Sequence, residues 1–302
     1  MEHEKGKSSN KYQLKKDKLG YMSSDPMPTA EYLKEFYQKV YFKDMPTITY
    51  GLDYPTDELE HKKFRAEALV HNVTNLFKNH SSKPNFLEIG FGEGFVLNAA
   101  NKKFKILGID YTDDALKRFH PELTPSIKQG DPSVELHKIS NTNIRFSVCV
   151  LHNVLEHVTD PKETMLQLKG VMKEDGILVI SVPNDFSKLQ EMALKLKLAP
   201  SEYWVCPPQH LQYFNTENFN GFCKELGFKI VDAYGDFPIE FFLFHTGSNY
   251  VLNRKNGKQA HQARILLDLL IAEKGMGPYL NFCRALYECG MGRNLTAFLK
   301  LQ

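Results

Sequence analysis

Short apolar runs alternate with amphipathic stretches through the middle of this 302-residue chain. Four such runs lie at Phe86 to Ile89, Phe104 to Ile109, Arg145 to Val150 and Ile177 to Val182. Near-continuous apolar runs of this length are typical of strands that are buried on both faces of a parallel sheet. The pattern therefore predicts an α/β fold, a mostly parallel sheet with helices on both faces, whose core spans residues 81–185.

A glycine-rich turn follows the first predicted strand. Gly90, Gly92 and Gly94 stand at alternate positions, and an alanine-containing apolar run then predicts the start of a helix. Glycine suits such a turn because it adopts unusual backbone angles and lets a ligand approach the main chain. The second strand leads into Asp110, twenty residues after Gly90, the spacing that places a carboxylate on a ribose diol. These features predict a nucleoside-binding unit.

The glycine spacing helps to decide which nucleoside is bound. Dinucleotide-binding turns follow the pattern G-x-G-x-x-G, whereas this turn is G-x-G-x-G with Glu88 two residues before it. A carboxylate there repels a pyrophosphate and attracts a cationic ligand. The segment from Glu88 to Gly94 resembles the first motif of class I S-adenosylmethionine-dependent methyltransferases. The resemblance implies that S-adenosyl-L-methionine is the cofactor. The predicted cofactor contacts in this region are Glu88, Gly90, Gly92, Gly94, Asp110 and Tyr111.

Two further segments supply the remaining site residues by the same resemblance. Family members carry a motif similar to Leu-Glu-His-Val-x-x-Pro, here Leu155 to Pro161, after a buried strand. The resemblance implies cofactor contacts at Leu151, His152, Asn153 and Asp131. Asp131 is also a good helix N-cap, and the two roles are compatible. His157 is a candidate catalytic residue, and the alternative is a buried ring that satisfies a backbone carbonyl.

A proline- and aromatic-rich loop spans residues 199–214 and contains the single tryptophan, Trp204. Rigid aromatic loops of this kind usually line a binding site. In the resembled family a similar Pro-x-His-x-x-x-Phe segment places its histidine on the substrate side, which makes His210 the predicted general base. A histidine has a pKa near 6.5, which suits deprotonation of a hydroxyl acceptor. The alternative is that His210 only holds the loop by hydrogen bonds.

The flanking regions resemble a narrower group, the methyltransferases of bacterial surface-glycan biosynthesis clusters. The resemblance rests on an aromatic helix around Phe36, a Lys62-x-x-Arg65 helix and a terminal Gly-x-Gly-Arg-Asn-Leu segment. It favours residues 295–301 over residues 239–244 as a reversed seventh strand, completing a Rossmann-like sheet. The predicted organisation is a flexible tail (1–19), an N-terminal helical lid (20–80), the cofactor-binding core (81–185), a substrate-side loop with helices (186–227) and C-terminal strands (228–302) with a helical insertion (247–289).

Composition and charge narrow the remaining possibilities. The formal net charge of +2 and a pI near 8.1 do not indicate nucleic acid as a partner. We expect a cytoplasmic protein without a membrane partner, because no membrane span or signal peptide is recognisable. The five cysteines lack C-x-x-C spacing, and neither a disulfide nor a metal site is predicted. The expected partner is a small molecule, such as a sugar or nucleotide-linked sugar, and a homodimer is possible.

The sequence thus predicts O-methylation of a sugar or related small polar building block, including phosphoramidate-type modifications, of a bacterial surface polysaccharide. An N- or C-methyltransferase acting on another metabolite is the nearest alternative. A nucleotide-binding dehydrogenase would need the G-x-G-x-x-G spacing. A non-catalytic scaffold would have lost Glu88, the glycines or Asp110, and all of them are present.

Overall fold

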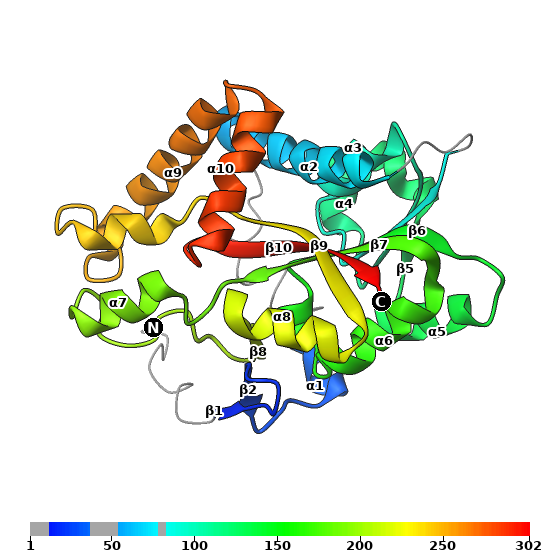
Figure 1. The fold of residues 1–302 in the computed structure, drawn as a ribbon, viewed down its shortest axis with the longest axis horizontal. Helices are drawn as coiled ribbons and strands as arrows, with labels where there is room; N and C mark the ends of the chain where they lie inside the picture. The colour runs from blue at the N-terminus through cyan, green and yellow to red at the C-terminus, as the bar shows by residue number, and fades with distance from the viewer. Residues whose placement is uncertain (1–11, 37–53, 78–82) are drawn as a thin grey trace, which may run out of the picture.

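The computed structural model describes residues 12–36, 54–77 and 83–302, and a seven-stranded sheet forms the centre of this part (Figure 1). Its strand order is β5-β4-β3-β6-β7-β10-β9, and only β10 runs antiparallel to its neighbours. The strands are β3 (Asn85–Ile89), β4 (Lys105–Asp110), β5 (Ile127–Gln129), β6 (Phe146–His152), β7 (Met172–Pro183), β9 (Phe228–Gly235) and β10 (Asn294–Leu301). This confirms the predicted Rossmann-like class.

Side chains from alternate strand positions enter two separate cores, one on each face of the sheet. Cys149 and Leu151 of β6 face one core, whereas Val148 and Val150 face the other. Helices α5, α6 and α8 cover the first face and α2, α3 and α10 cover the second, as Figure 1 shows below and above the sheet. The helices are α2 (Thr56–Leu76), α3 (Phe95–Asn101), α4 (Asp114–Phe119), α5 (Pro132–Ser140), α6 (Pro161–Val171), α8 (Thr216–Glu225) and α10 (Met276–Glu288).

The last strand and the preceding helices confirm the preferred topology of the C-terminal region. Strand β10 lies between β7 and β9, whereas the alternative strand at residues 239–244 is the 3-10 helix η4 (Ile239–Phe244). The helical insertion contains η5 (Arg254–Asn256), α9 (Gly257–Ala272) and α10. A buried hydrogen bond of 2.6 Å joins His61 Nε2 on α2 to Asp268 Oδ2 on α9, and the Tyr279 hydroxyl also donates to Asp268. The insertion is therefore attached to the α2 side of the sheet.

A second, three-stranded sheet corrects the prediction of a flexible tail at residues 1–19. Strands β1 (Gln13–Lys16), β2 (Met22–Asp25) and β8 (Gln212–Tyr213) pair in antiparallel fashion, in the order β1-β2-β8. The Ser23 hydroxyl donates to Gln212 Oε1 at 2.6 Å, and the Tyr21 ring stacks on Phe214. The prediction was wrong for residues 12–19 because their sheet is completed by a strand almost 200 residues away in the sequence. Residues 1–11 lie outside the described part.

The N-terminal helices are described only in part. Helix α1 covers Ala30–Glu35, and the rest of the helix predicted from Tyr32 to Phe42 lies outside the described residues, as does most of the aromatic connection at 47–55. The lid role of residues 20–80 therefore stays a prediction. On the substrate side, α7 (Lys188–Lys195) is shorter than the predicted helix over residues 186–198. In the described ranges, every helix is too short or too polar to span a lipid bilayer.

Candidate functional site

The turn after β3 has the backbone geometry that the glycine pattern predicted. Gly90, Gly92 and Gly94 all have positive φ, at 70°, 50° and 81°. The Gly90 amide donates to the Ile109 carbonyl of the neighbouring strand at 2.8 Å. A Cβ atom at Gly90 would lie 2.4 Å from Cγ2 of Val154, closer than any van der Waals contact allows. The turn thus needs glycine for both its dihedral angles and its packing.

Two buried acids flank this turn. Glu88 is 2% exposed, and its Oε2 atom has no hydrogen-bond partner among the residues that the structure describes. Asp110 is 7% exposed, and its carboxylate accepts hydrogen bonds from the amides of Gly92 at 2.9 Å and Tyr111 at 2.6 Å. Burial raises the pKa of Asp110 to about 6. Burial, and secondly the charge of Asp110, raise the pKa of Glu88 well above its usual value. The pair forms a buried acidic pocket, and a cation bound beside it would lower both pKa values and favour the charged carboxylates.

Two neighbouring cavities meet at this turn. A cavity of about 440 Å³ is lined by Asp110, Tyr111 and Asp131, and a second of about 590 Å³ is lined by Glu88 and the three glycines. Three residues line both cavities, namely Gly90, Asn153 and His157. Together the cavities form a continuous binding region along the carboxyl ends of β3, β4 and β6, where open α/β sheets bind ligands.

The structure brings most of the predicted cofactor contacts to these cavities. His152 lines the larger one, and Asn153 has a φ of 58° with a buried, unpartnered Oδ1 atom. Asp131 lines the smaller cavity and also caps α5 by accepting from the Ser133 amide at 2.9 Å, so its two predicted roles are compatible. Leu151 is the exception, because its side chain is fully buried in the core and lines neither cavity. The prediction of Leu151 as a cofactor contact stays a prediction.

Helix α2 supplies cations to the larger cavity that were not predicted as site residues. The Lys62 ammonium lies 3.4 Å from the Glu93 carboxylate, and Arg65 forms an ion pair with Asp236 at the end of β9. Burial, and secondly the charge of Arg65, lower the pKa of His152 to about 4, so this ring is neutral. The Lys62-x-x-Arg65 spacing was visible in the sequence, since residues three apart share a helix face. The sequence did not show that Lys62 and Arg65 lie beside the glycine turn.

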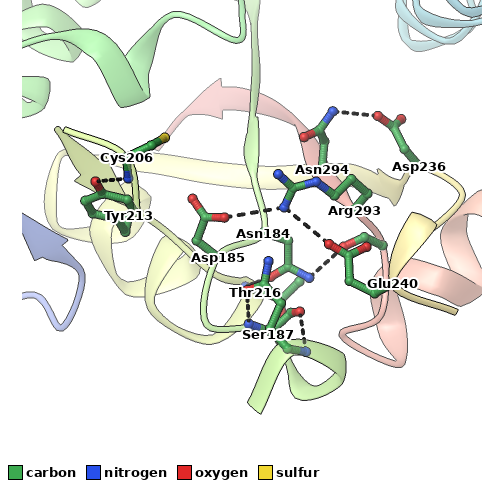
Figure 2. A network of polar contacts seen from close by, with 12 residues as sticks. Asn184, Asp185, Ser187, Cys206, Tyr213, Thr216, Asp236, Glu240, Arg293 and Asn294 are labelled. Carbon is green, nitrogen blue, oxygen red and sulfur yellow. Dashed lines mark hydrogen bonds and ion pairs between the residues drawn. The ribbon is translucent and has the colours of Figure 1, made fainter. Parts of the chain in front are cut away.

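The far wall of the larger cavity contains a buried polar network (Figure 2). Nη1 of Arg293 lies 3.4 Å from both Asp185 Oδ1 and Glu240 Oε1, and Figure 2 shows the guanidinium between these two carboxylates. Tyr203 and Trp204 of the aromatic loop line the same cavity, and the Trp204 indole nitrogen is buried without a partner. Aromatic rings next to charged and hydrogen-bonding groups suit a small polar acceptor.

A cluster of Glu156, His157 and His210 lies in the larger cavity, and one candidate ligand atom from each lies within 4.8 Å of those of the other two. Burial raises the pKa of Glu156 to about 8 and lowers that of His157 to about 4. Burial, and secondly His157, lower the pKa of His210 well below its usual value. Both imidazoles are therefore neutral near pH 7. The structure thus brings together the two predicted catalytic histidines and adds Glu156.

The contacts of the two histidines bear on the structural alternatives left open by the sequence. His157 donates through Nδ1 to the Gln209 carbonyl at 2.5 Å, so its ring does satisfy a backbone carbonyl while it also lines the cavity. The Nδ1 atom of His210 is buried, and no residue in the described part of the chain forms a hydrogen bond with it. The backbone of His210, and not its ring, holds the loop, since its carbonyl accepts from the Tyr213 hydroxyl at 2.8 Å.

Comparison with known proteins establishes the family of this chain. A family model described as "Methyltransferase domain" matches residues 61–233, more than half of the chain. The chain therefore belongs to this methyltransferase family, and S-adenosylmethionine is its cofactor. A ubiquinone biosynthesis O-methyltransferase from Glaesserella parasuis serovar 5 (strain SH0165) is 30% identical over 158 residues, which cover 46% of this chain and 66% of that protein.

Two further similarities are more distant. The protein of the same description from Rickettsia akari (strain Hartford) is 25% identical over 53% of this chain and 61% of its own length. The chain thus spans less than two thirds of both O-methyltransferases. A solved SAM-dependent methyltransferase from Archaeoglobus fulgidus aligns with 82% of this chain and 100% of its own, at 17% identity and a TM-score of 0.48.

The residues of the two cavities fit the cofactor of this family. The Asp110 carboxylate at the end of β4 would hold the ribose hydroxyls, and the acidic pocket with Glu88 suits the cationic part of the molecule. Glu88 Oε2 and Asn153 Oδ1 are buried hydrogen-bond acceptors for which the described residues supply no donor. A bound cofactor would supply donors to such atoms. Gly90 lines both cavities, so its main chain is next to the space that the cofactor would occupy.

Binding of S-adenosylhomocysteine is expected to weaken as the pH falls below about 6, where the buried Asp110 gains a proton. A carboxylate accepts hydrogen bonds from two hydroxyls, whereas the protonated acid loses one acceptor position. Linkage to a single proton predicts up to about a tenfold loss of affinity per pH unit below that pKa. Calorimetric titration from about pH 8 to about pH 5 measures the affinity as a function of pH. In the Asp110→Asn variant the affinity should depend much less on pH. A flat profile in the unaltered protein would contradict the assignment.

Replacing Gly90 by alanine is expected to destabilise the fold and weaken cofactor binding. Left-handed backbone costs a non-glycine residue about 1–2 kcal/mol, and overpacking against Val154 adds about 1–3 kcal/mol. Gly170 is the matched control, because it lies exposed in α6 and a Cβ added there would meet nothing within 4 Å. Gly170→Ala should raise the free energy of unfolding slightly. Chemical denaturation measures both, and equal effects of the two changes would contradict the packing argument.

Proposed function

We propose that the protein transfers a methyl group to a hydroxyl oxygen of a small polar acceptor. The observation that carries this proposal is the cluster of Glu156, His157 and His210, which places two neutral imidazoles in the same cavity as the glycine turn. A hydroxyl is a weak nucleophile near neutral pH and needs a group that removes its proton. The descriptions of the curated relatives as O-methyltransferases agree with a hydroxyl acceptor.

The proposed chemistry needs alignment, exclusion of water and one proton acceptor. When bound, the cofactor supplies an electrophilic methyl group on a sulfonium. The glycine turn and Asp110 position the nucleoside end of the cavity system, and Asn153 and His157 lie at the junction with the larger cavity. His210 is the proposed proton acceptor, with His157 beside it at a ring-centroid distance of 5.0 Å. Tyr203 and Trp204, on the same loop as His210, line this cavity and offer apolar ring faces to the acceptor.

The proposed acceptor is a sugar or related building block of a bacterial surface polysaccharide, including its phosphoramidate-type modifications. The larger cavity supports a polyhydroxyl compound, because the Trp204 and Tyr203 rings offer apolar faces and Arg293 and Asn294 offer hydrogen-bond donors. The resemblance of the flanking segments to glycan-cluster methyltransferases supports the same choice. An N- or C-methyl acceptor would not need the imidazole cluster when its nucleophile is already deprotonated.

The test combines binding with product analysis. Calorimetric titration with S-adenosylhomocysteine, with NAD as control, establishes the cofactor site, and we expect micromolar binding of the former alone. A panel of sugars and nucleotide-linked sugars, together with amines and carbon acids, is then incubated with methyl-labelled cofactor, and NMR locates the methyl group. The expected product is a methyl ether or ester. Transfer to nitrogen or carbon alone would overturn the O-methylation proposal while leaving the family assignment intact.

A further inference from the structure

We propose that Glu156, His157 and His210 form a binding site for one divalent first-row transition-metal ion, such as Zn²⁺ or Mn²⁺, in the acceptor part of the larger cavity. Sequence reasoning predicted no metal site, because two of these residues are adjacent in 3-10 helix η3 (Leu155–His157) and the third lies more than 50 residues later. The inference rests on the proposed function and specifies how the cluster activates the acceptor.

The spacing of the three side chains fits a single ion. Their candidate ligand atoms all lie within 4.8 Å of one another. Two metal–ligand bonds of about 2.1 Å that meet at a tetrahedral angle place their ligand atoms about 3.4 Å apart. Side-chain rotations would therefore bring a pair at the 4.8 Å limit closer by about 1.4 Å. Two imidazoles and one carboxylate are a donor set used by catalytic zinc and by other first-row metals.

Two of the three side chains have buried polar atoms that nothing in the described protein satisfies. Glu156 is 1% exposed, and its Oε2 atom has no hydrogen-bond partner. The buried Nδ1 atom of His210 also lacks one. Burial without a partner disfavours the charged form of Glu156, and buried carboxylates in proteins keep their charge when they are paired or coordinate metals. Arg293 forms its ion pairs with Asp185 and Glu240, and its charge acts on Glu156 only from a greater distance.

The backbone around the cluster holds the ligands in a fixed arrangement. His157 donates through Nδ1 to the Gln209 carbonyl, which leaves the lone pair of the neutral ring on Nε2, 3.7 Å from Glu156 Oε1. A ligating histidine commonly donates its other N–H to a carbonyl in this way. The Leu211 amide donates to the Glu156 carbonyl at 2.8 Å, which ties the loop of His210 to η3. These contacts hold η3, which carries Glu156 and His157, next to the loop that carries His210.

A three-ligand site leaves coordination positions open toward the cavity, which all three residues line. A hydroxyl of the acceptor bound there would have a lowered pKa and would lose its proton to water. The oxygen lone pair would then form the new O–CH₃ bond, while the electron pair of the breaking S–CH₃ bond stays on sulfur. With the metal bound, the two imidazoles are ligands, and they act as proton acceptors only in the metal-free protein.

The test titrates chelator-treated protein with Co²⁺, followed by visible absorption, and with Mn²⁺, followed by electron paramagnetic resonance. We expect one ion per chain, and Glu156→Gln and His210→Asn should each weaken binding at least about tenfold. Glu58→Gln and His261→Asn are matched controls, because these side chains form a carboxylate–imidazole pair at 3.3 Å outside both cavities. The controls should leave metal affinity unchanged.

S-adenosylhomocysteine titration of every variant separates this inference from the proposed function. Variants that keep cofactor binding are folded, so a loss of metal binding in them supports the site. No metal binding by the unaltered protein at millimolar concentration would overturn the inference. So would equal metal affinity in the cluster variants and the controls. O-methyl transfer that persists at full rate after chelation would also overturn it, while the proposed function itself would stand.

Discussion

Replacing His210 by asparagine is expected to lower kcat about a hundredfold or more while leaving the affinity for S-adenosylhomocysteine unchanged. Loss of general acid–base assistance typically costs about 10²–10⁴ in rate. The ring of His210 lines the larger cavity, whereas Asp110 and Asp131 line the smaller one, so the nucleoside contacts stay in place. A decrease in kcat is also expected if His210 acts as a metal ligand, since either role requires its imidazole nitrogen. Methyl-transfer kinetics and calorimetry measure the two quantities separately.

His137→Asn is the matched control for this change. His137 is an exposed residue in the last turn of α5, away from both cavities, and the same substitution there should alter neither quantity. Equal loss of cofactor binding and turnover in His210→Asn would show that the residue supports the fold of the loop. Unchanged kcat in that variant would remove His210 from the mechanism.

Replacing Asp110 by alanine is expected to weaken S-adenosylhomocysteine binding about a hundredfold. Hydrogen bonds to a charged group contribute about 1.5–3 kcal/mol each, and loss of two bonds to the ribose diol at the lower value gives about 3 kcal/mol, or roughly a hundredfold. The carboxylate also accepts from the Gly92 amide, so its removal takes away one of the bonds that hold the glycine turn to β4, while the bond from the Gly90 amide to the Ile109 carbonyl remains. The loss of affinity therefore combines a direct and an indirect effect.

Asp110→Asn and Asp175→Ala separate these contributions. The amide retains an acceptor for the turn and loses the charge, so its affinity should fall between those of the unaltered protein and the alanine variant. Asp175 is an exposed residue in β7, and its removal should change nothing measurable. If the alanine variant bound S-adenosylhomocysteine within about threefold of the unaltered protein, the binding free energies would differ by less than about 0.7 kcal/mol. Asp110 would then not be the ribose-binding residue.

The sequence by itself determined those parts of the protein that depend on neighbours along the chain. Strand β3, its glycine turn and the acid at the end of β4 form one continuous unit, and each residue is required by local backbone geometry or by spacing along the chain. Buried parallel strands were equally visible because their apolar runs need no alternation. For this reason the sequence indicates the turn and its flanking acids residue by residue, whereas the cofactor contacts themselves, Leu151 among them, stay predictions.

The tertiary structure decided what depends on segments that are far apart in the sequence. Strand β1 is polar and became recognisable only through pairing with β2 and, beyond it, β8. The position of β10 between β7 and β9 was chosen over residues 239–244 by resemblance, and the structure establishes it. Glu156 and His210 meet because the backbone of Leu211 bonds to that of Glu156, and the cations of α2 reach the glycine turn because the helix packs across α3. Contacts of this kind arise from packing and long-range hydrogen bonds, which no local pattern of hydrophobic and polar residues encodes.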